Sequence, residues 1–254
     1  MKLRFAGATD IGRKRKQNQD RFLIQPDDNL FVVCDGMGGH LGGEVASQMA
    51  VDDMANFFIQ TRTDDEITWP YRPDKRLSIL ENKLTVSIKW ANWNIFHKAA
   101  EEAELSGMGT TSVAIAVDEK HLAIAHVGDS RCYRIRGGEI TQLTTDHSLL
   151  EEYKKYSALS EEEIANFAYK NVITRSLGMK VTVLVDTQTH SKKAGDLYLL
   201  CCDGLYGELE DPQEILHTIN EFRSNLDEAA AELIARANRR GGRDNITVVL
   251  VELY

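Results

Sequence analysis

Two apolar segments, far apart in the sequence, each run directly into an aspartate followed by a glycine. Phe31-Val32-Val33-Cys34 precedes Asp35-Gly36, and the run from Leu197 to Cys202 precedes Asp203-Gly204. Short apolar runs of strand-forming residues predict buried β-strands. Each carboxylate is then held at the rim of a sheet, where the glycine lets the backbone approach a ligand closely. We therefore expect one site that is built from two directions.

The composition limits the classes of protein to consider. The chain has 254 residues, 43% of them hydrophobic, and no linker or low-complexity tract divides it, which predicts a single domain over residues 1–254. A net charge of −9 argues against a nucleic-acid partner. No apolar stretch reaches the ~20 residues of a membrane span. The four cysteines lack C-x-x-C spacing, which favours a reducing, cytoplasmic setting. We expect a monomer without a membrane partner.

Helical periodicity appears in two parts of the chain. A helix is expected after His40, with its buried stripe at Val45, Ala46, Met49, Ala50, Met54, Phe57 and Phe58. A longer helix is expected from about Leu77 to Leu105, and one or two more over Ile215–Arg239. The segment from Leu149 to Tyr169 also has helical, charged character.

The strands are short and separated by turns. Phe22–Ile24 and Phe31–Cys34 predict a hairpin, because Asp28-Asn29 is a turn signal. Four further runs predict an antiparallel meander: Thr110–Val117, His121–Val127, Arg131–Ile135 and Glu139–Leu143. Further strands are expected at Leu3–Thr9, Val181–Val185, Leu197–Cys202 and Ile246–Leu253. This order predicts an α+β fold, with two mostly antiparallel sheets stacked face to face and helices outside.

Four aspartates lie at strand ends or tight turns, beside a glycine or an asparagine: Asp35, Asp129, Asp203 and Asp244. Taken singly, an Asp-Gly pair is more often an ordinary turn. Oxygen ligands suit Mg²⁺ or Mn²⁺ and not zinc, and converging carboxylates need cations to offset their repulsion. If these residues converge, a hard divalent metal is expected.

Eight motifs follow one another over almost the whole chain: Thr9 to Asp20, Asp35-Gly36-Met37-Gly38-Gly39-His40, Gly107-Met108-Gly109-Thr110-Thr111, Val127-Gly128-Asp129-Ser130-Arg131, Thr145-Asp146-His147-Ser148, Ile173 to Gly178, Cys202-Asp203-Gly204-Leu205 and Arg243-Asp244-Asn245-Ile246-Thr247. In this order they resemble the motifs of bacterial PP2C-type (PPM family) metal-dependent serine/threonine phosphatases. The resemblance implies a four-layer α-β-β-α sandwich with a flap at about residues 148–171. It also implies hydrolysis of phosphoserine and phosphothreonine in proteins, opposing a serine/threonine kinase.

The resemblance further implies roles for individual residues. Asp35 would bridge two Mn²⁺ or Mg²⁺ ions, and the carbonyl of Gly36 would bind one of them. Asp203 and Asp244 would complete the first ion, and Asp129 would bind a third. Asp20 would orient water, and Arg15 would bind phosphate.

The residue types fit this chemistry independently of the resemblance. Two ions can activate a shared water and neutralise phosphoryl oxygens, so that no cysteine or serine nucleophile is needed. Arg15 can bind phosphate oxygens bidentately. His40 and His147 are candidate general acids for the leaving alkoxide, and a structural role is an equal alternative for each.

Two alternatives share the scaffold. A catalytically silent phosphoprotein-binding module would have a broken metal-ligand set, whereas Asp35, Asp129, Asp203 and Asp244 are all present. A phosphatase of small metabolites would keep the set and differ in substrate. A dinucleotide or P-loop protein is excluded, because Leu41 stands where G-x-G-x-x-G requires a glycine and no Gly-Lys-Ser/Thr follows.

Overall fold

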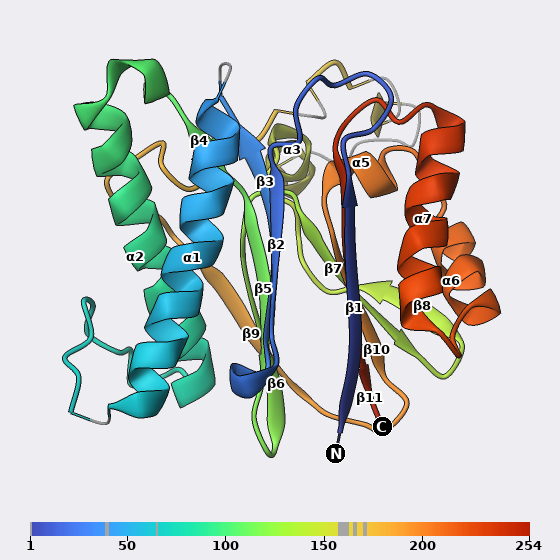
Figure 1. Ribbon diagram of the computed structural model, residues 1–254, viewed down its shortest axis with the longest axis horizontal. Coiled ribbons are helices and arrows are strands. Elements are labelled where there is room, and N and C mark those ends of the chain that lie inside the picture. The colour runs from blue at the N-terminus through green and yellow to red at the C-terminus, as the bar shows by residue number, and fades with distance from the viewer. Residues whose placement is uncertain (1, 39–40, 65, 157–162, 165–166, 170–171) are drawn as a thin grey trace.

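Two β-sheets lie face to face between two layers of helices (Figure 1). The computed structural model describes residues 2–38, 41–64, 66–156, 163–164, 167–169 and 172–254. One outer layer holds α1 (Gly42–Thr63) and α2 (Ile79–Glu101), and the other holds α6 (Pro212–Glu221) and α7 (Leu226–Arg240). The expected four-layer α-β-β-α sandwich is thereby confirmed.

All strand pairs in the two sheets are antiparallel, as far as the described residues show. The first sheet has the order β2 (Asp20–Gln25), β3 (Leu30–Met37), β5 (Ser112–Val117), β6 (His121–Val127) and β9 (Asp186–Ser191), with β4 (Gly109–Thr110) paired to β3. The second has the order β1 (Leu3–Asp10), β11 (Ile246–Leu253), β10 (Leu197–Cys201), β7 (Arg131–Arg136) and β8 (Glu139–Gln142).

The central strands are apolar on both faces because each face is covered. In β3, Val32 and Cys34 pack in the core beneath α1 and α2, whereas Phe31 and Val33 pack in the core between the sheets. Along β10, Leu199 likewise packs in the core that contains residues of α6 and α7, and Leu200 faces the opposite sheet. The continuous apolar runs of the sequence therefore follow from the layered architecture.

The helices expected after His40, from about Leu77 and over Ile215–Arg239 are confirmed, with adjusted ends. The α2 helix begins at Ile79 because Ser78 forms a capping box, in which its hydroxyl accepts from the Glu81 N–H and its N–H donates to the Glu81 carboxylate. The helix ends at Glu101, and a separate 3₁₀ turn, η2 (Ala103–Leu105), follows it. Another 3₁₀ turn, η1 (Pro26–Asp28), joins the confirmed hairpin of β2 and β3.

Two strand predictions were wrong. The strand expected at Val181–Val185 lies instead at Asp186–Ser191, where β9 forms a sheet edge with polar, partly exposed side chains that lack an apolar signature. The expected meander is also broken. The β6 strand belongs to the first sheet and β7 to the second, so the chain crosses between the sheets at residues 128–130.

The segment expected to form the flap begins with α3 (Leu149–Tyr156), and much of the remainder lies outside the described residues. Its two ends meet, because Ser148 and Ile173 form an antiparallel bridge. No helix in the described part of the chain is long and apolar enough to cross a membrane.

Candidate active site

Five aspartates, which come from separate elements, converge at one end of the sandwich. Asp20 begins β2 and lies opposite Asp35 of β3 in the strand register. Asp129 lies in the crossing between β6 and β7, Asp203 begins α5 (Asp203–Tyr206) directly after β10, and Asp244 precedes β11. One cavity of about 320 Å³ is lined by three of them, Asp129, Asp203 and Asp244. The predicted convergence is therefore present in the structure.

Backbone hydrogen bonds fix the position of Asp35. Its N–H donates to the Thr111 hydroxyl at 3.0 Å, and its carbonyl accepts from the Thr111 N–H at 2.8 Å and the Thr110 hydroxyl at 2.9 Å. A Cβ on the next residue, Gly36, would lie 2.1 Å from the Gly43 carbonyl oxygen. Only glycine allows the start of α1 to pack this closely against the strand.

Asp20 is completely buried next to Asp35. One carboxylate oxygen of Asp20 accepts a hydrogen bond of 2.6 Å from the Thr247 hydroxyl, whereas the other is buried without a partner. Oδ1 of Asp203 is also buried without a partner. Buried carboxylate oxygens without donors are costly in a native structure and indicate a missing ligand.

The carboxylates disfavour one another's ionisation. Burial, followed by the charge of Asp203, raises the pKa of Asp129 to about 7. Burial also raises the pKa of Asp20 to about 6, and burial with neighbouring charges, Asp20 first, raises the pKa of Asp35 well above its ordinary value. The site thus carries concentrated negative charge that a cation would neutralise.

Tyr206 and Arg131 support Asp129, an arrangement that no sequence pattern indicates. The Tyr206 hydroxyl donates to the Asp129 carbonyl at 3.1 Å. The Arg131 guanidinium stacks on the Tyr206 ring, 3.5 Å from its centroid, and forms a hydrogen-bonded ion pair with Asp146 at 2.7 Å. Arg131 and Asp146 lie in quoted motifs, but their pairing depends on a fold contact that spacing does not reveal.

Arg15 lies beside the cluster, where it forms an ion pair with Asp244 at 2.5 Å. This hydrogen bond raises the pKa of Arg15 further. Asn245 holds the loop that carries Arg15, because its amide donates to the Ile11 and Gln17 carbonyls at 2.9 Å and accepts from the Gln19 N–H at 2.8 Å. Arg15 and Asn245 also line a second cavity, of about 730 Å³.

Of the two candidate general acids, the structure describes only His147. His40 lies outside the described residues. His147 is buried, and burial, followed by the neighbouring His126 and Arg175, lowers its pKa to about 4. A ring with this pKa is neutral at physiological pH, which does not favour His147 as a proton donor.

The cluster offers oxygen atoms only, apart from the neighbouring thiol of Cys202. Asp20, Asp35 and Cys202 have ligand-type atoms within 4.8 Å of one another. Burial raises the pKa of Cys202 well above its ordinary value, so the thiol stays protonated. Carboxylates in this arrangement fit a hard divalent ion and not a thiolate-bound one.

Comparisons with known proteins agree with this chemistry. The sequence profile of the family described as Protein phosphatase 2C matches residues 9–238. The chain is 38% identical over 251 residues to the serine/threonine phosphatase stp of Listeria welshimeri, covering 96% of this chain and 93% of the relative.

Solved structures have the same fold over nearly the full length. The Mycobacterium tuberculosis serine/threonine phosphatase PstP/Ppp superposes with a TM-score of 0.85 at 34% identity, covering 99% of this chain and 98% of that one. The catalytic domain of the serine/threonine protein phosphatase PstP in complex with two manganese ions gives a TM-score of 0.80 at 33% identity, covering 98% and 97%.

Proposed function

This chain belongs to the protein phosphatase 2C family, and on that premise we propose how its acidic cluster hydrolyses phosphoproteins. It is a protein serine/threonine phosphatase that depends on divalent metal. The observation that carries the assignment is the convergence of Asp129, Asp203 and Asp244 on one cavity, next to Asp20 and Asp35.

We propose that Asp35, the Gly36 carbonyl, Asp203 and Asp244 hold two Mn²⁺ or Mg²⁺ ions, and that Asp129 holds a third together with Asp203. The buried unpartnered oxygens of Asp20 and Asp203 and the mutually raised pKa values support a cation site. When bound, such ions neutralise phosphoryl oxygens and make water a stronger nucleophile at neutral pH. Asp20 accepts from Thr247 with one oxygen, which leaves the other to orient water.

Arg15 is proposed to bind the substrate phosphate. Its side chain is 54% exposed and pairs with Asp244. It can therefore exchange this carboxylate for a phosphate dianion by a side-chain movement alone. A planar guanidinium binds two phosphate oxygens at once. We expect it to bind the substrate and the transition state about equally, so its loss should raise KM more than it lowers kcat. His40 remains a prediction for the proton donor.

The proposed substrates are proteins phosphorylated on serine or threonine by an opposing kinase. The names of the relatives support this class, and the intact acidic set argues against a silent binding module. We also propose that the enzyme is a cytoplasmic monomer. Its four cysteines are buried and free, the state that a reducing compartment maintains.

A substrate panel tests the assignment. Phosphoserine, phosphothreonine and phosphotyrosine peptides, p-nitrophenyl phosphate and sugar phosphates are compared with Mn²⁺, Mg²⁺ or chelator. We expect hydrolysis of the phosphoserine and phosphothreonine peptides with metal only. Asp35→Asn and Asp203→Asn should each lower turnover by orders of magnitude. Near-normal rates in both variants would refute the proposal, and preference for sugar phosphates would favour a metabolite phosphatase.

A further inference from the structure

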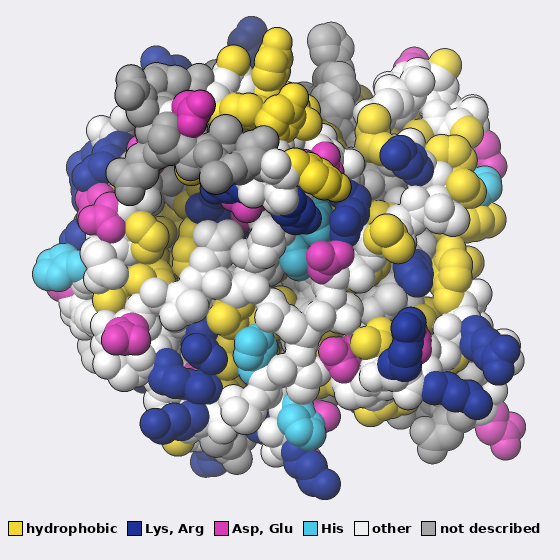
Figure 2. Space-filling view, turned by 180° about the vertical axis from the view of Figure 1, so that it is seen from behind, with side chains coloured by type: hydrophobic (Ala, Val, Ile, Leu, Met, Phe, Trp, Pro, Cys, Tyr) yellow, Lys and Arg dark blue, Asp and Glu magenta, His cyan; other side chains and the backbone are white. Residues whose placement is uncertain are grey.

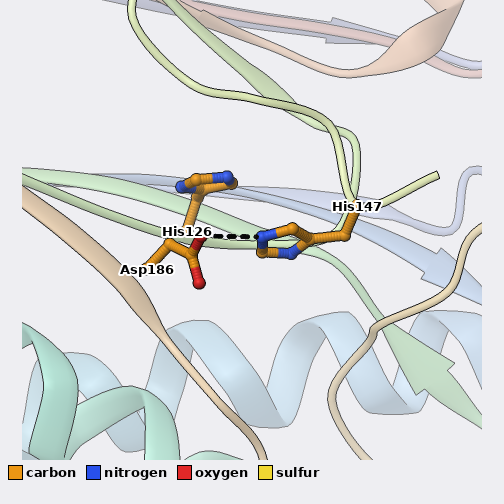
Figure 3. A group of neighbouring side chains, drawn as sticks. All are labelled: His126, His147 and Asp186. Carbon is orange, nitrogen blue, oxygen red and sulfur yellow. Dashed lines mark ion pairs between the residues drawn. The ribbon is translucent and has the colours of Figure 1, made fainter. Parts of the chain in front are cut away.

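A group of polar side chains lies outside the acidic cluster, at the point where the expected flap leaves the body of the protein. His126 of β6 lies opposite Asp186 of β9 in the strand register, and the His147 ring stacks on the His126 ring with centroids 4.6 Å apart (Figure 3). In Figure 2, histidine side chains lie beside acidic and basic side chains near the centre of the face. We call His126, His147, Arg175 and Asp186 the flap-base group.

The flap-base group joins the two ends of the expected flap. Thr174 N–H donates to the His147 carbonyl at 2.8 Å, immediately beside the bridge between Ser148 and Ile173. Arg175 donates to Asp186 at 2.5 Å, and its Nη1 lies 3.0 Å from Nε2 of His147. His147 and Arg175, on either side of the expected flap, therefore both contact Asp186 of the edge strand β9.

His147 forms two hydrogen bonds with the backbone of Gly128, one through its ring and one through its own N–H. The Gly128 N–H donates to Nδ1 of His147 at 3.0 Å, and the His147 N–H donates to the Gly128 carbonyl at 2.9 Å. Gly128 has φ +106°, and a Cβ there would lie 2.6 Å from Cγ2 of Thr111, so only glycine fits this turn. The next residue is Asp129.

These contacts determine the tautomer of His147. A neutral imidazole has one acceptor nitrogen, and the Gly128 N–H occupies it at Nδ1. The proton is therefore on Nε2, which faces Asp186 Oδ2 at 3.3 Å (Figure 3). Nη1 of Arg175 can only donate, so its approach to this N–H is not a hydrogen bond, and it donates instead to Asp186 and to the Leu184 carbonyl. A second proton on Nδ1 would point at the Gly128 N–H.

The same tautomer argues against a metal ion in this group. His126, His147 and Asp186 have ligand-type atoms within 4.8 Å of one another, a spacing that a transition metal could use. However, Nε2 of His147 carries a proton, and the cationic Arg175 lies 3.0 Å from it. Nε2 of His126 is 2.9 Å from the Thr145 carbonyl. The group is better explained as a set of hydrogen bonds that orients His147.

We propose that His147 is a positioning residue, which holds the Gly128 turn so that the Asp129 carboxylate is presented to the metal cluster. Tyr206 holds the Asp129 carbonyl from the other side at 3.1 Å. His147 at the base of the expected flap is thus hydrogen-bonded to the residue that precedes Asp129, the proposed ligand of the third ion. This inference rests on the proposed role of Asp129 as a ligand.

Two substitutions distinguish the roles of Nδ1 and Nε2 of His147. In His147→Asn, the amide oxygen can occupy the place of Nδ1 and accept from Gly128. In His147→Gln, the longer side chain reaches toward Asp186 but offers no acceptor at Nδ1. Loss of an outer contact to a metal ligand typically lowers metal affinity by about 10–100-fold. We expect such a loss for the weakest Mn²⁺ site in His147→Gln, and affinity near that of the wild type in His147→Asn.

The readouts include the metal-free protein. Isothermal titration of the full chain with Mn²⁺ gives the site affinities, amide exchange reports the Gly128 N–H, and ¹⁵N NMR reports the His147 tautomer. His190→Gln, which alters a histidine elsewhere on β9, is the control and should change none of them. Faster Gly128 exchange in His147→Gln alone would support the proposal.

Two results would overturn the proposal. A proton on Nδ1 of wild-type His147 would do so without any variant, and so would equal Mn²⁺ affinities in His147→Gln and the wild type. Asp129→Asn shows whether the positioning role of His147 or the ligand role of Asp129 is the wrong part. If Asp129→Asn loses the weakest Mn²⁺ site while His147→Gln keeps it, the positioning role alone is wrong. If Asp129→Asn keeps all sites, the ligand role of Asp129 is wrong, and the positioning role falls with it.

Discussion

Replacing Asp129 with asparagine should stabilise the metal-free protein while weakening its response to metal. Asp129 is 7% exposed, and its pKa is raised from 3.8 to about 7 by burial and by the charge of Asp203. At 1.36 kcal/mol for each pH unit, the ionised carboxylate costs the fold up to about 4 kcal/mol. Asparagine keeps the shape and cannot ionise, so this cost disappears.

The pH dependence of the effect has a defined sign. Between the unfolded pKa near 3.9 and the folded pKa of about 7, the folded wild type binds the additional proton, so its stability falls as pH rises. The gap between Asp129→Asn and the wild type should therefore open from pH 4 to pH 7 and stay constant above that range. Each kcal/mol corresponds to roughly 2–4 °C in Tm for a protein of this size, so the variant should melt several degrees higher at pH 8.

Thermal and urea unfolding of the chelator-treated full chain, at pH 5 and pH 8, measures the gap. Saturating Mn²⁺ should then raise the Tm of the wild type more than that of the variant, since a ligand that binds only the folded state stabilises it. Glu104→Gln makes the same charge change at an exposed position and should leave both unchanged. A variant that is less stable than the wild type at pH 8 would mean that Asp129 is an ordinary turn residue.

Three further substitutions test individual contacts. Gly36→Ala should lower stability by about 1–3 kcal/mol or more in urea unfolding, because its Cβ would lie 2.1 Å from a backbone oxygen; a loss below about 1 kcal/mol would contradict this. Arg15→Ala should raise KM for a phosphothreonine peptide and leave kcat nearly unchanged; an unchanged KM would remove Arg15 from the phosphate site. Tyr206→Phe should cost about 1 kcal/mol in thermal unfolding by losing one hydrogen bond to Asp129; an unchanged Tm would mean that this bond adds nothing.

Strands that are buried on both faces carry the clearest signal in the sequence. The β3 and β11 strands contain the apolar runs Leu30–Cys34 and Val248–Val251, because helices cover one face and the opposite sheet covers the other. The β9 strand was misplaced because it forms an edge, where polar residues serve as well as apolar ones. The crossing from β6 to β7 was missed because the signal of a turn does not state which sheet receives the next strand.

The site follows the same division. The aspartates at strand ends were predictable because local pattern and motif order agree, and the structure brings them to one place. The supports of the site were not predictable, because Tyr206 reaches Asp129 and Thr247 reaches Asp20 across separations of 77 and 227 residues. His147 was expected to be either a general acid or a structural residue, and the choice depends on the fold, since burial and the neighbouring His126 and Arg175 lower the pKa of its ring.

The central claim is that Asp35, Asp203 and Asp244 hold divalent cations at one place. Crystals of the full chain grown with Mn²⁺, with diffraction recorded on both sides of the manganese absorption edge, test it most directly. We predict two anomalous peaks among these three carboxylates, and a third between Asp129 and Asp203. Crystals in which this region shows no anomalous peak at saturating Mn²⁺ would contradict the account.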